Sequence, residues 1–464
     1  MESAVSIFFI LLSLGLLMFL AYRGWSVILM APVCALLAAA ASGLHVLPTY
    51  TELFMAKTAT YFKNFFPLFM LGAVFGKVME DSGAARAIAS AVVRSLGRER
   101  AILSVVLACA ILTYGGVSLF VVAFAVYPFA AALFKEAGIP KRLIPGCIAL
   151  GSFTFTMVGL PGTPQIQNMI PTRYFGTTAY AAPVTGIIYS LIVFVAGVAW
   201  LEWRRRKAMA AGEGYGQHTK NEPANDNSDK LPSVWLSLLP MVAVLVLNFI
   251  LTRVFKDLNP EIMKPFAGAS PIAQVAPTWA LIVALVVGIV MAILFNWRTM
   301  KDKYVASLNQ GTLGSLLAIL NTASEVGYGN TIAALAGFKA IAAGLLSIKL
   351  GGTPLVSEAL TVNVLAGITG SASGGMSIAL ETMGKQYLEW AMNIGLSPEL
   401  LHRVAAMASS GFDTLPHNGA VITLLAICGL THRDSYLDIF MVATVITFAT
   451  GFLLALLAPV IGIV

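Results

Sequence analysis

The chain has 464 residues, of which 58% are hydrophobic and only 11% are charged, and its mean hydropathy is +0.84. This composition excludes an ordinary water-soluble protein, and several apolar runs reach the roughly 20 residues that cross about 30 Å of hydrocarbon. The net charge of +7 comes from basic residues spread over many short segments. That distribution favours cytoplasmic loop bias over nucleic-acid binding.

The predicted elements of the first half, residues 1–203, follow a simple order. Spans are predicted at 4–22, 25–47 and 63–83, and an amphipathic segment at 84–98 is expected at the membrane interface. Two apolar stretches too short to cross a bilayer then predict a re-entrant hairpin over 101–135. A span over 140–172, interrupted at 159–164 by glycines and prolines, and a last span at 180–201 complete this half.

Residues 204–232 are polar and non-periodic, which predicts a flexible cytoplasmic linker. The second half, residues 233–464, repeats the plan of the first. Its predicted elements are spans at 233–254, 276–297 and 308–329, an interfacial helix at 331–349, a hairpin over 352–393 tipped at 370–377, a broken span at 398–430 and a final span at 436–463.

Short phrases recur in the same order in both halves. Gly115-Gly116-Val117-Ser118 returns 259 residues later as Gly374-Gly375-Met376-Ser377, and each copy is followed by a helix-breaking Leu-Pro. We interpret the chain as an internal duplication. Placing most Lys and Arg residues inside puts both termini outside, which fits ten spans and two halves of opposite orientation. The predicted fold is an all-α polytopic membrane protein with two inverted repeats of five spans, a plan typical of secondary transporters.

The four interruptions are expected to converge on one polar site, because non-helical backbone at membrane depth is tolerated only inside protein or facing water. Glycines at the hairpin tips expose backbone N–H groups, and helix N-termini favour an anion. The predicted substrate-binding residues are Gly115, Gly116, Ser118, Thr163, Gln165, Asn168, Gly374, Gly375, Ser377, Thr414 and Asn418. The alternative is structural, with tight turns and side chains that satisfy backbone groups freed by the prolines.

Three ionisable residues lie in apolar surroundings, where burying a charge is expensive. Glu325, Asp413 and His417 are therefore candidates for carrying a coupled proton. The alternatives are an interfacial position for Glu325, and for Asp413 a helix cap or a partner that holds His417.

The sequence offers no enzyme or cofactor site. It has no Gly-x-Ser-x-Gly, no His-Glu-x-x-His and no Walker loop, and its five histidines are not clustered. We therefore expect no metal and no cofactor. The four cysteines, Cys34, Cys109, Cys147 and Cys428, lie in apolar segments without paired spacing and are expected to be buried thiols. The N-terminal stretch lacks a basic region and a cleavage site, which favours a retained first span.

These phrases resemble the GntP-type gluconate permease family within the ion-transporter superfamily, and the resemblance covers nearly the whole chain. It rests on Gly115-Gly116-Val117-Ser118, Gly159-Leu160-Pro161-Gly162-Thr163-Pro164, Gly374-Gly375-Met376-Ser377 and Asp413-Thr414-Leu415-Pro416-His417-Asn418-Gly419. The opening Phe19-Leu20-Ala21-Tyr22-Arg23-Gly24-Trp25-Ser26-Val27 looks more like the branch described as D-3-hydroxybutyrate permeases. The resemblance implies proton symport of a small hydroxy-monocarboxylate in a bacterial-type inner membrane, and a homodimer with a scaffold and a moving transport domain.

The sequence therefore favours a proton symporter of a small organic anion, and the resemblance implies that its motion is of the elevator type. Two alternatives remain in the same class, a gluconate or sugar-acid carrier and a sodium-coupled carboxylate carrier, although the Ser-Asn-Thr words of sodium-dependent dicarboxylate carriers are absent. An anion channel, which would need a continuous polar pore, and a membrane-embedded enzyme are alternatives of other classes.

Overall fold

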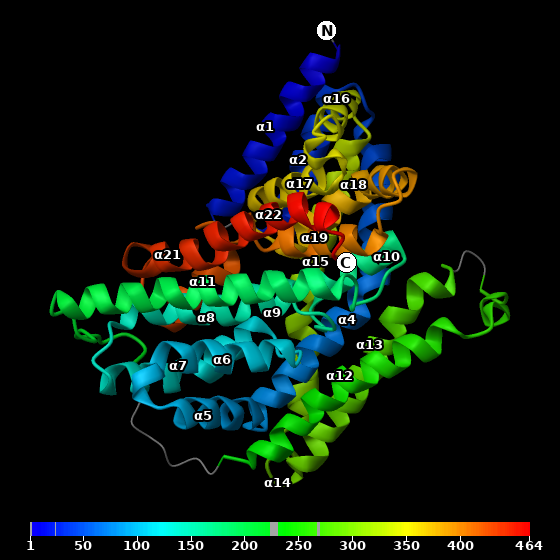
Figure 1. The fold of residues 1–464 in the computed structure, drawn as a ribbon. Helices are drawn as coiled ribbons and strands as arrows, with labels where there is room; N and C mark the ends of the chain where they lie inside the picture. The colour runs from blue at the N-terminus through cyan, green and yellow to red at the C-terminus, as the bar shows by residue number, and fades with distance from the viewer. Residues whose placement is uncertain (1, 24, 223–230, 267–269) are drawn as a thin grey trace.

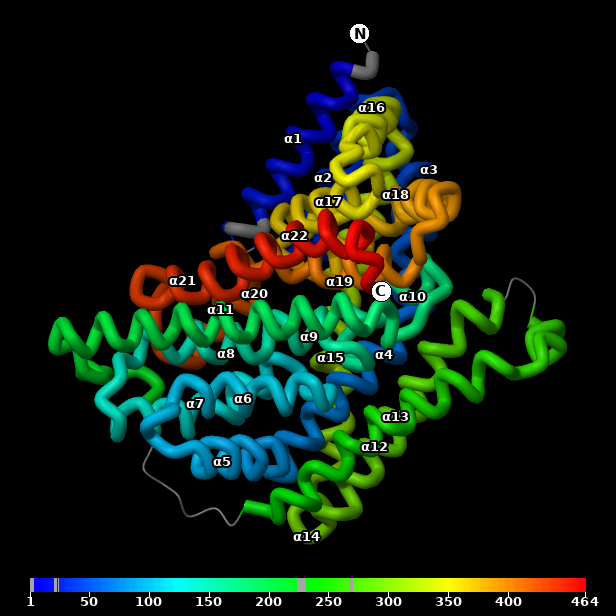
Figure 2. Tube along the Cα trace, in the orientation of Figure 1, coloured from blue at the N-terminus to red at the C-terminus, as the bar shows by residue number. Residues whose placement is uncertain are grey.

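A computed structural model describes residues 2–23, 25–222, 231–266 and 270–464, and these residues form helices and connecting turns with no strand among them (Figures 1 and 2). The α-helices are α1 (Glu2–Tyr22), α2 (Val27–Ala41), α3 (Val46–Pro48), α4 (Ala56–Asp81), α5 (Ala84–Leu96), α6 (Ala101–Tyr114), α7 (Leu119–Glu136), α8 (Ile144–Ser152), α9 (Phe155–Val158), α10 (Ile166–Phe175), α11 (Pro183–Ala210), α12 (Val234–Lys256), α13 (Ile272–Phe295), α14 (Trp297–Met300), α15 (Tyr304–Ala333), α16 (Ala336–Leu346), α17 (Leu355–Thr369), α18 (Ala372–Asn393), α19 (Pro398–Ser409), α20 (Gly419–Ile427), α21 (His432–Phe440) and α22 (Ile446–Ile461). The 3-10 and π segments used below are η1 (Thr49–Met55), η3 (Lys141–Leu143), η4 (Pro260–Met263), η6 (Phe412–Thr414) and η7 (Met441–Val445).

Within the described residues, six helices are long and apolar enough to cross a membrane, and a seventh span results if α15 and α16, bent by 96°, count as one. The sequence predicted ten. The difference lies in short apolar helices such as Ala4–Leu20, Val27–Ala41 and Leu355–Thr369, which fall below that length. The molecule is a multi-pass membrane protein whose spans are in part built from short pieces.

Two long helices, α4 and α15, pack side by side at the centre of the fold. Residues Val46–Asp81 form one helical run of 36 residues. The second predicted span, 25–47, therefore ends earlier than expected, because a new helix begins at Val46. Glycines on α15 allow the close approach: a Cβ at Gly311 would lie 2.6 Å from Val74 Cα, and one at Gly327 would lie 3.0 Å from Phe54 O. Small residues are what close helix packing in a membrane requires.

The remaining helices gather around this pair. Helices α12 and α13 pack against each other and extend away from the rest of the molecule (Figure 1). The predicted amphipathic segments correspond to α5, which packs on α6, α7 and α12, and α16, which packs on α1. Helices α6 to α11 and α17 to α22 form the other side of the molecule, where the hairpins and broken spans lie (Figure 2). All four cysteines are buried and free, which confirms that prediction.

The two hairpin tips differ in a way that the repeated phrase does not predict. In the first hairpin Gly115 and Gly116 form the turn between α6 and α7, and Gly116 has a positive φ of 93°. In the second hairpin the turn is at Gly370 and Ser371, and Gly374 and Gly375 already lie in the first turn of α18. Ser377, at the end of the predicted tip at 370–377, therefore lies inside a helix.

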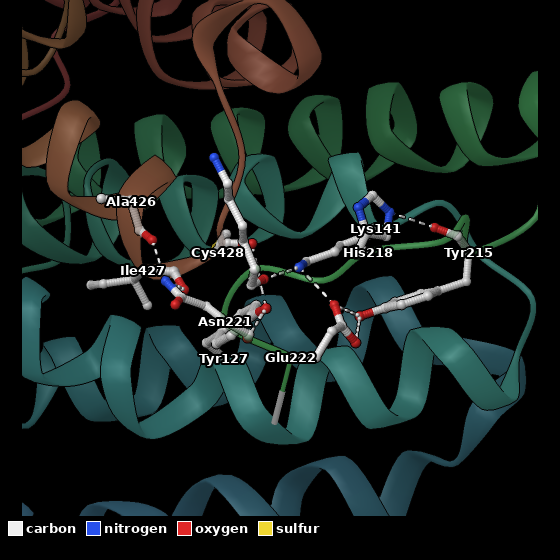
Figure 3. A network of polar contacts seen from close by, with 10 residues as sticks. Tyr127, Lys141, Tyr215, His218, Asn221, Glu222, Ala426, Ile427 and Cys428 are labelled. Carbon is white, nitrogen blue, oxygen red and sulfur yellow. Dashed lines mark hydrogen bonds and ion pairs between the residues drawn. The ribbon is translucent and has the colours of Figure 1, made fainter. Parts of the chain in front are cut away.

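Part of the predicted linker between the halves is helical or packs on the helices. Helix α11 continues to Ala210, so the first residues of the predicted linker at 204–232 are helical. Residues 211–222 then fold back onto the helices, where Lys141 Nζ, whose side chain is fully buried, lies 2.7 Å from Glu222 Oε1 (Figure 3). The Tyr215 hydroxyl donates to the same carboxylate. Residues 223–230 lie outside the described residues.

Asn221 joins this segment to both halves of the chain. Its carbonyl accepts a hydrogen bond from the Tyr127 hydroxyl of α7 at 2.8 Å, and its Nδ2 donates to Ala426 O of α20 at 2.7 Å (Figure 3). Asn221 has a positive φ of 53°, a conformation that asparagine tolerates better than most residues. We call residues 211–222 the strap, because they hold helices of the first and second halves together.

Candidate functional site

A cavity of about 540 Å³ lies near the helix breaks and is here called the central cavity. It lies between α15, the tip of the second hairpin and the second broken span, with α7 and α4 on its other walls. Its polar lining consists of Gln167, Asn321, Thr322, Glu325, Thr369, Ser371, Ser373, Asp413, His417, Asn418 and Thr423. No lysine or arginine is among the described residues that line it.

All three ionisable residues singled out in the sequence line this cavity. Glu325 comes from α15, Asp413 from η6 and His417 from the turn before α20. Each has a buried polar atom without a hydrogen-bond partner in the described part of the chain: Glu325 Oε2, Asp413 Oδ1 and His417 Nε2. Buried polar atoms are normally paired, so these three are open to a proton, a water molecule or a substrate.

The tip of the second hairpin is built around Glu325. The Ser371 hydroxyl caps α18 by accepting a hydrogen bond from Gly374 N at 3.1 Å. A Cβ at Gly374 would overlap Glu325 Oε2, so glycine leaves the space that the carboxylate occupies. The N–H of Gly375 is donated to Ser371 O, and a Cβ at Gly375 would overlap the α17 backbone. Both glycines serve helix capping and close packing, and neither amide is free for a ligand.

Asn418 connects the second break to the hairpin. Its Oδ1 caps α20 by accepting from Ala420 N at 2.6 Å and Val421 N at 3.1 Å. Its Nδ2 donates to Gly370 O at 2.9 Å and Asp413 O at 2.7 Å. The side chain therefore lines the cavity with its polar atoms already engaged, as in the structural alternative.

Two other predicted residues of the second half lie away from the cavity lining. The Thr414 hydroxyl is paired with the Thr444 hydroxyl of η7 at 2.7 Å. The buried Ser377 hydroxyl donates to Tyr61 of α4 at 3.3 Å. In this structure both hydroxyls join helices to each other.

In the first half, the hairpin tip and the break enclose a smaller cavity of about 250 Å³ that includes Gly116, Ser118 and Gln165. It shares wall residues with the central cavity, among them Gln167 and Ser373, so the two adjoin. Gln165 Nε2 donates to Thr113 O at 2.8 Å and Val117 O at 3.3 Å, which ties the break to the hairpin. The first-half tip thus lies beside the site.

Gly115 does not line either cavity. It packs against Met241 of α12, and a Cβ there would overlap the Met241 methyl group.

Asn168 and the backbone carbonyl of Thr163 belong to a separate buried network centred on Arg403, whereas the Thr163 hydroxyl has no hydrogen-bond partner in the described residues. Asn168 Nδ2 donates to Thr163 O and Ala179 O, and its Oδ1 accepts from Arg403 Nη1 at 3.0 Å. Arg403 is fully buried, and its other donors reach the carbonyls of Val158 and Ala181. Arg403, which belongs to the second half, therefore donates hydrogen bonds to backbone carbonyls beside the break in the first half.

Sequence reasoning missed several residues of this region. Ser371 and Ser373 fall inside the predicted tip at 370–377, and their hydroxyls next to glycines were a usable signal. Arg403 was a charged residue inside a predicted broken span, the feature that singled out Glu325. Gln167, whose buried Oε1 has no partner in the described residues, stands between two predicted residues of the first break.

Comparison with known proteins identifies the class of molecule. The model of the GntP family permeases matches residues 5–461. The chain belongs to the GntP permease family. A GntP permease is a membrane transporter, and the chain is 51% identical over 463 residues to the uncharacterized transporter YxjC of Bacillus subtilis (strain 168), covering 96% of this chain and 98% of that one. An uncharacterized transporter of Haemophilus influenzae is 24% identical over 75% of this chain and 74% of its own.

Solved transporters share the fold of this GntP permease. The YdaH transporter of Alcanivorax borkumensis matches with a TM-score of 0.58 at 15% identity, over 99% of this chain and 98% of that chain. MtrF of Neisseria gonorrhoeae, described as one of a class of antimetabolite efflux pumps, matches with a TM-score of 0.53 at 13% identity, over 87% and 83%. At these identities the likeness concerns the fold alone.

Proposed function

We propose that this GntP permease is a secondary active symporter that moves a small hydroxy-monocarboxylate, such as 3-hydroxybutyrate, together with protons. The observation that carries the proposal is the meeting of Glu325, Asp413 and His417 around one cavity, each with a polar atom that has no hydrogen-bond partner among the described residues. Ionisable groups at membrane depth are costly and mark proton or substrate pathways. Hydroxyl and amide groups on the same wall suit carboxylate and hydroxyl oxygens.

Charge gives the physical reason for coupling. An anion entering a cavity that holds Glu325 and Asp413 meets like charges at low dielectric, so anion binding and protonation of these groups favour each other. One monovalent anion with one proton is also neutral. Its passage avoids the cost of about 2.3 kcal/mol per charge per 100 mV.

The proposal includes two inverted halves of five spans and an elevator-type motion. The order of elements supports it. Each half has three leading helices, the amphipathic helix α5 or α16, a hairpin, a broken span and a closing helix. Packing between the halves supports it too: α4 packs on α15, α15 on α2, and α13 on α4. In this proposal these leading helices, with α1 and α12, form the scaffold, and the remaining body carries the site. The proposal extends to a homodimer in a bacterial-type inner membrane, with both termini outside.

Transport assays in proteoliposomes test the proposal directly. Labelled 3-hydroxybutyrate and gluconate are offered first under an inward proton gradient and then under a sodium gradient. We expect proton-driven accumulation of hydroxybutyrate, with a loss of at least about tenfold in Asp413→Asn and His417→Ala. Glu389→Gln, which alters an exposed ion pair on α18, is the control and should transport normally.

Other outcomes of this assay contradict specific parts of the proposal. A response to sodium without a response to pH would overturn proton coupling. Accumulation of gluconate alone would move the substrate to the sugar acids. Current without saturation or counterflow would show a channel.

A further inference from the structure

We propose that a second cavity, bordered by α4, α10, α13 and the turn after η4, is a cationic vestibule that binds the anionic substrate before it reaches the central cavity. This inference rests on the proposed function for the identity of the anion. It concerns a different set of residues.

The vestibule has a volume of about 630 Å³, similar to the central cavity. Its charged lining residues are Lys63 of α4 and Arg173 of α10, and the facing wall is the α13 stripe that includes Thr278 and Trp279. Asn64 and Ser270 add amide and hydroxyl groups. Two cations with neighbouring hydrogen-bond donors are the groups that recognise a carboxylate.

Neither cation forms an ion pair with an acidic side chain within the described residues. Arg173 Nη2 donates to the Ser270 hydroxyl at 3.0 Å, and no carboxylate lies within 4 Å of Lys63 or Arg173 in the part of the chain that the structure describes. The neighbouring acid is Glu381, which already binds Lys57 Nζ at 3.0 Å and the Tyr174 hydroxyl at 3.0 Å. The described lining of the vestibule therefore carries two cationic side chains and no acidic one.

Three helices contribute residues both to the vestibule and to the smaller cavity that adjoins the central cavity. On α4 the vestibule residue Pro67 is followed directly by Leu68 of the smaller cavity. On α13 the vestibule residue Ile282 lies one turn before Leu285 of the smaller cavity. On α10 Arg173 lies two turns from Gln167, which lines both the smaller and the central cavities.

The vestibule supplies what the central cavity lacks. The central cavity has two carboxyl groups and no lysine or arginine among the described residues of its lining, so it does not attract an anion over a distance. Cations at the end of an approach route raise the local concentration of an anion and its association rate. In this proposal the substrate anion is first attracted by Lys63 and Arg173 in the vestibule. It then binds, linked to protons, beside Glu325 and Asp413 in the central cavity.

The first test compares transport by Lys63→Gln/Arg173→Gln with a control that removes the same charges elsewhere. The control is Arg298→Gln/Lys301→Gln, since these exposed cations lie beyond the opposite end of α13. At low salt we expect the vestibule variant to raise the KM for hydroxybutyrate about three- to tenfold with little change in maximal rate. The difference should disappear at high salt, because salt screens the attraction. An unchanged KM at low salt overturns the proposal.

The second test does not depend on transport. Trp279 lies in the vestibule, and its fluorescence is quenched in turn by iodide, which is anionic, and by acrylamide, which is neutral. Each quenching constant is divided by the constant for free tryptophan with the same quencher. We expect the resulting ratio to be higher for iodide than for acrylamide. The Trp279 signal is obtained by difference from Trp279→Phe. In Lys63→Gln/Arg173→Gln iodide quenching should fall while acrylamide quenching stays constant. Equal iodide quenching in both proteins overturns the vestibule. Normal iodide enrichment without hydroxybutyrate uptake would instead overturn the proposed substrate and leave the vestibule standing.

Discussion

Gly374 decides where the Glu325 carboxylate sits, because any side chain at this position would occupy the place of Glu325 Oε2. Ser371, which caps the same helix turn, lies beside both residues. The contact links the second hairpin to α15. A change at the hairpin tip is therefore a change at an ionisable group of the candidate site.

We expect Gly374→Ala to reduce proton-driven uptake at least about tenfold, because the added methyl group displaces the carboxylate that we assign to coupling. Gly384→Ala is a matched control on the same helix, where the added Cβ meets only ordinary contacts of 3.6 Å or more. Uptake by the two variants is compared at equal amounts of folded protein, measured by size-exclusion chromatography. Equal uptake would remove Glu325 from the mechanism.

Arg403 acts on the fold at the same scale. We expect Arg403→Lys to lower stability by about 3 kcal/mol, because lysine cannot reach the carbonyls of Val158 and Ala181 and Asn168 Oδ1 together. Thermal unfolding in detergent measures the loss. Lys385→Gln, at an exposed cation of α18, should leave the unfolding temperature unchanged. An Arg403→Lys variant that unfolds at the wild-type temperature would show that the hydrogen bonds of the Arg403 guanidinium are not needed for stability.

At the scale of the element, glycine spacing sets the contact between α4 and α15. We expect Gly311→Ala to destabilise the protein, because its Cβ would lie 2.6 Å from the Val74 backbone and the helices must move apart. Gly314→Ala, one turn away with open space around it, should be neutral or slightly stabilising, since alanine is favoured over glycine in a helix by roughly 0.5–1 kcal/mol. Thermal unfolding of both variants checks the sign. The same sign for both would mean that this contact is not limiting.

The elements could largely be predicted from the sequence, and the exceptions have physical causes. Short apolar stretches and Leu-Pro phrases located the hairpins and the breaks, since lengths and prolines act locally. The repeated Gly-Gly did not locate the second tip. In α18 Gly374 leaves room for Glu325 and Gly375 allows a close approach to Ala366, whereas in the first hairpin the two glycines form a turn. One residue pattern serves two backbone conformations.

The candidate site was predicted in part for the same reason. Glu325, Asp413 and His417 stood out because charge is rare in apolar sequence, and the fold brings all three to one cavity. For Asn168 and Thr414 the sequence could not decide between ligand binding and internal hydrogen bonds, because the partners come from distant segments such as Arg403 and Thr444. Lys63 and Arg173 were missed because each lies near a predicted span end, where cations are common.

At the scale of the whole molecule, the strap adds contacts that depend on charge. Arg142 of η3 donates to Glu213 through Nε at 2.6 Å and Nη2 at 2.8 Å, and this guanidinium lowers the pKa of the Glu213 carboxyl below its usual 4.5. The contact therefore stabilises the strap above pH 4.5 and is lost as the pH falls through the lowered pKa.

We expect the strap to loosen on acidification, and Glu213→Gln to remove that pH dependence. Hydrogen exchange over 211–222, corrected for the intrinsic rate at each pH, measures it. In the wild-type protein protection should decline only below pH 4.5, whereas in Glu213→Gln it should already be lower at pH 6 and change less on acidification. Protection that is flat with pH in the wild-type protein would contradict this assignment.

The strap also bears on what a break in this segment would cost. A peptide that merely joined residues 1–203 to residues 233–464 could be cut or exchanged without consequence. Here Asn221 holds α7 on one side and α20 on the other, and Glu222 pairs with a fully buried lysine. A chain shortened or exchanged in this segment would therefore lose contacts between helices, and not only a covalent connection.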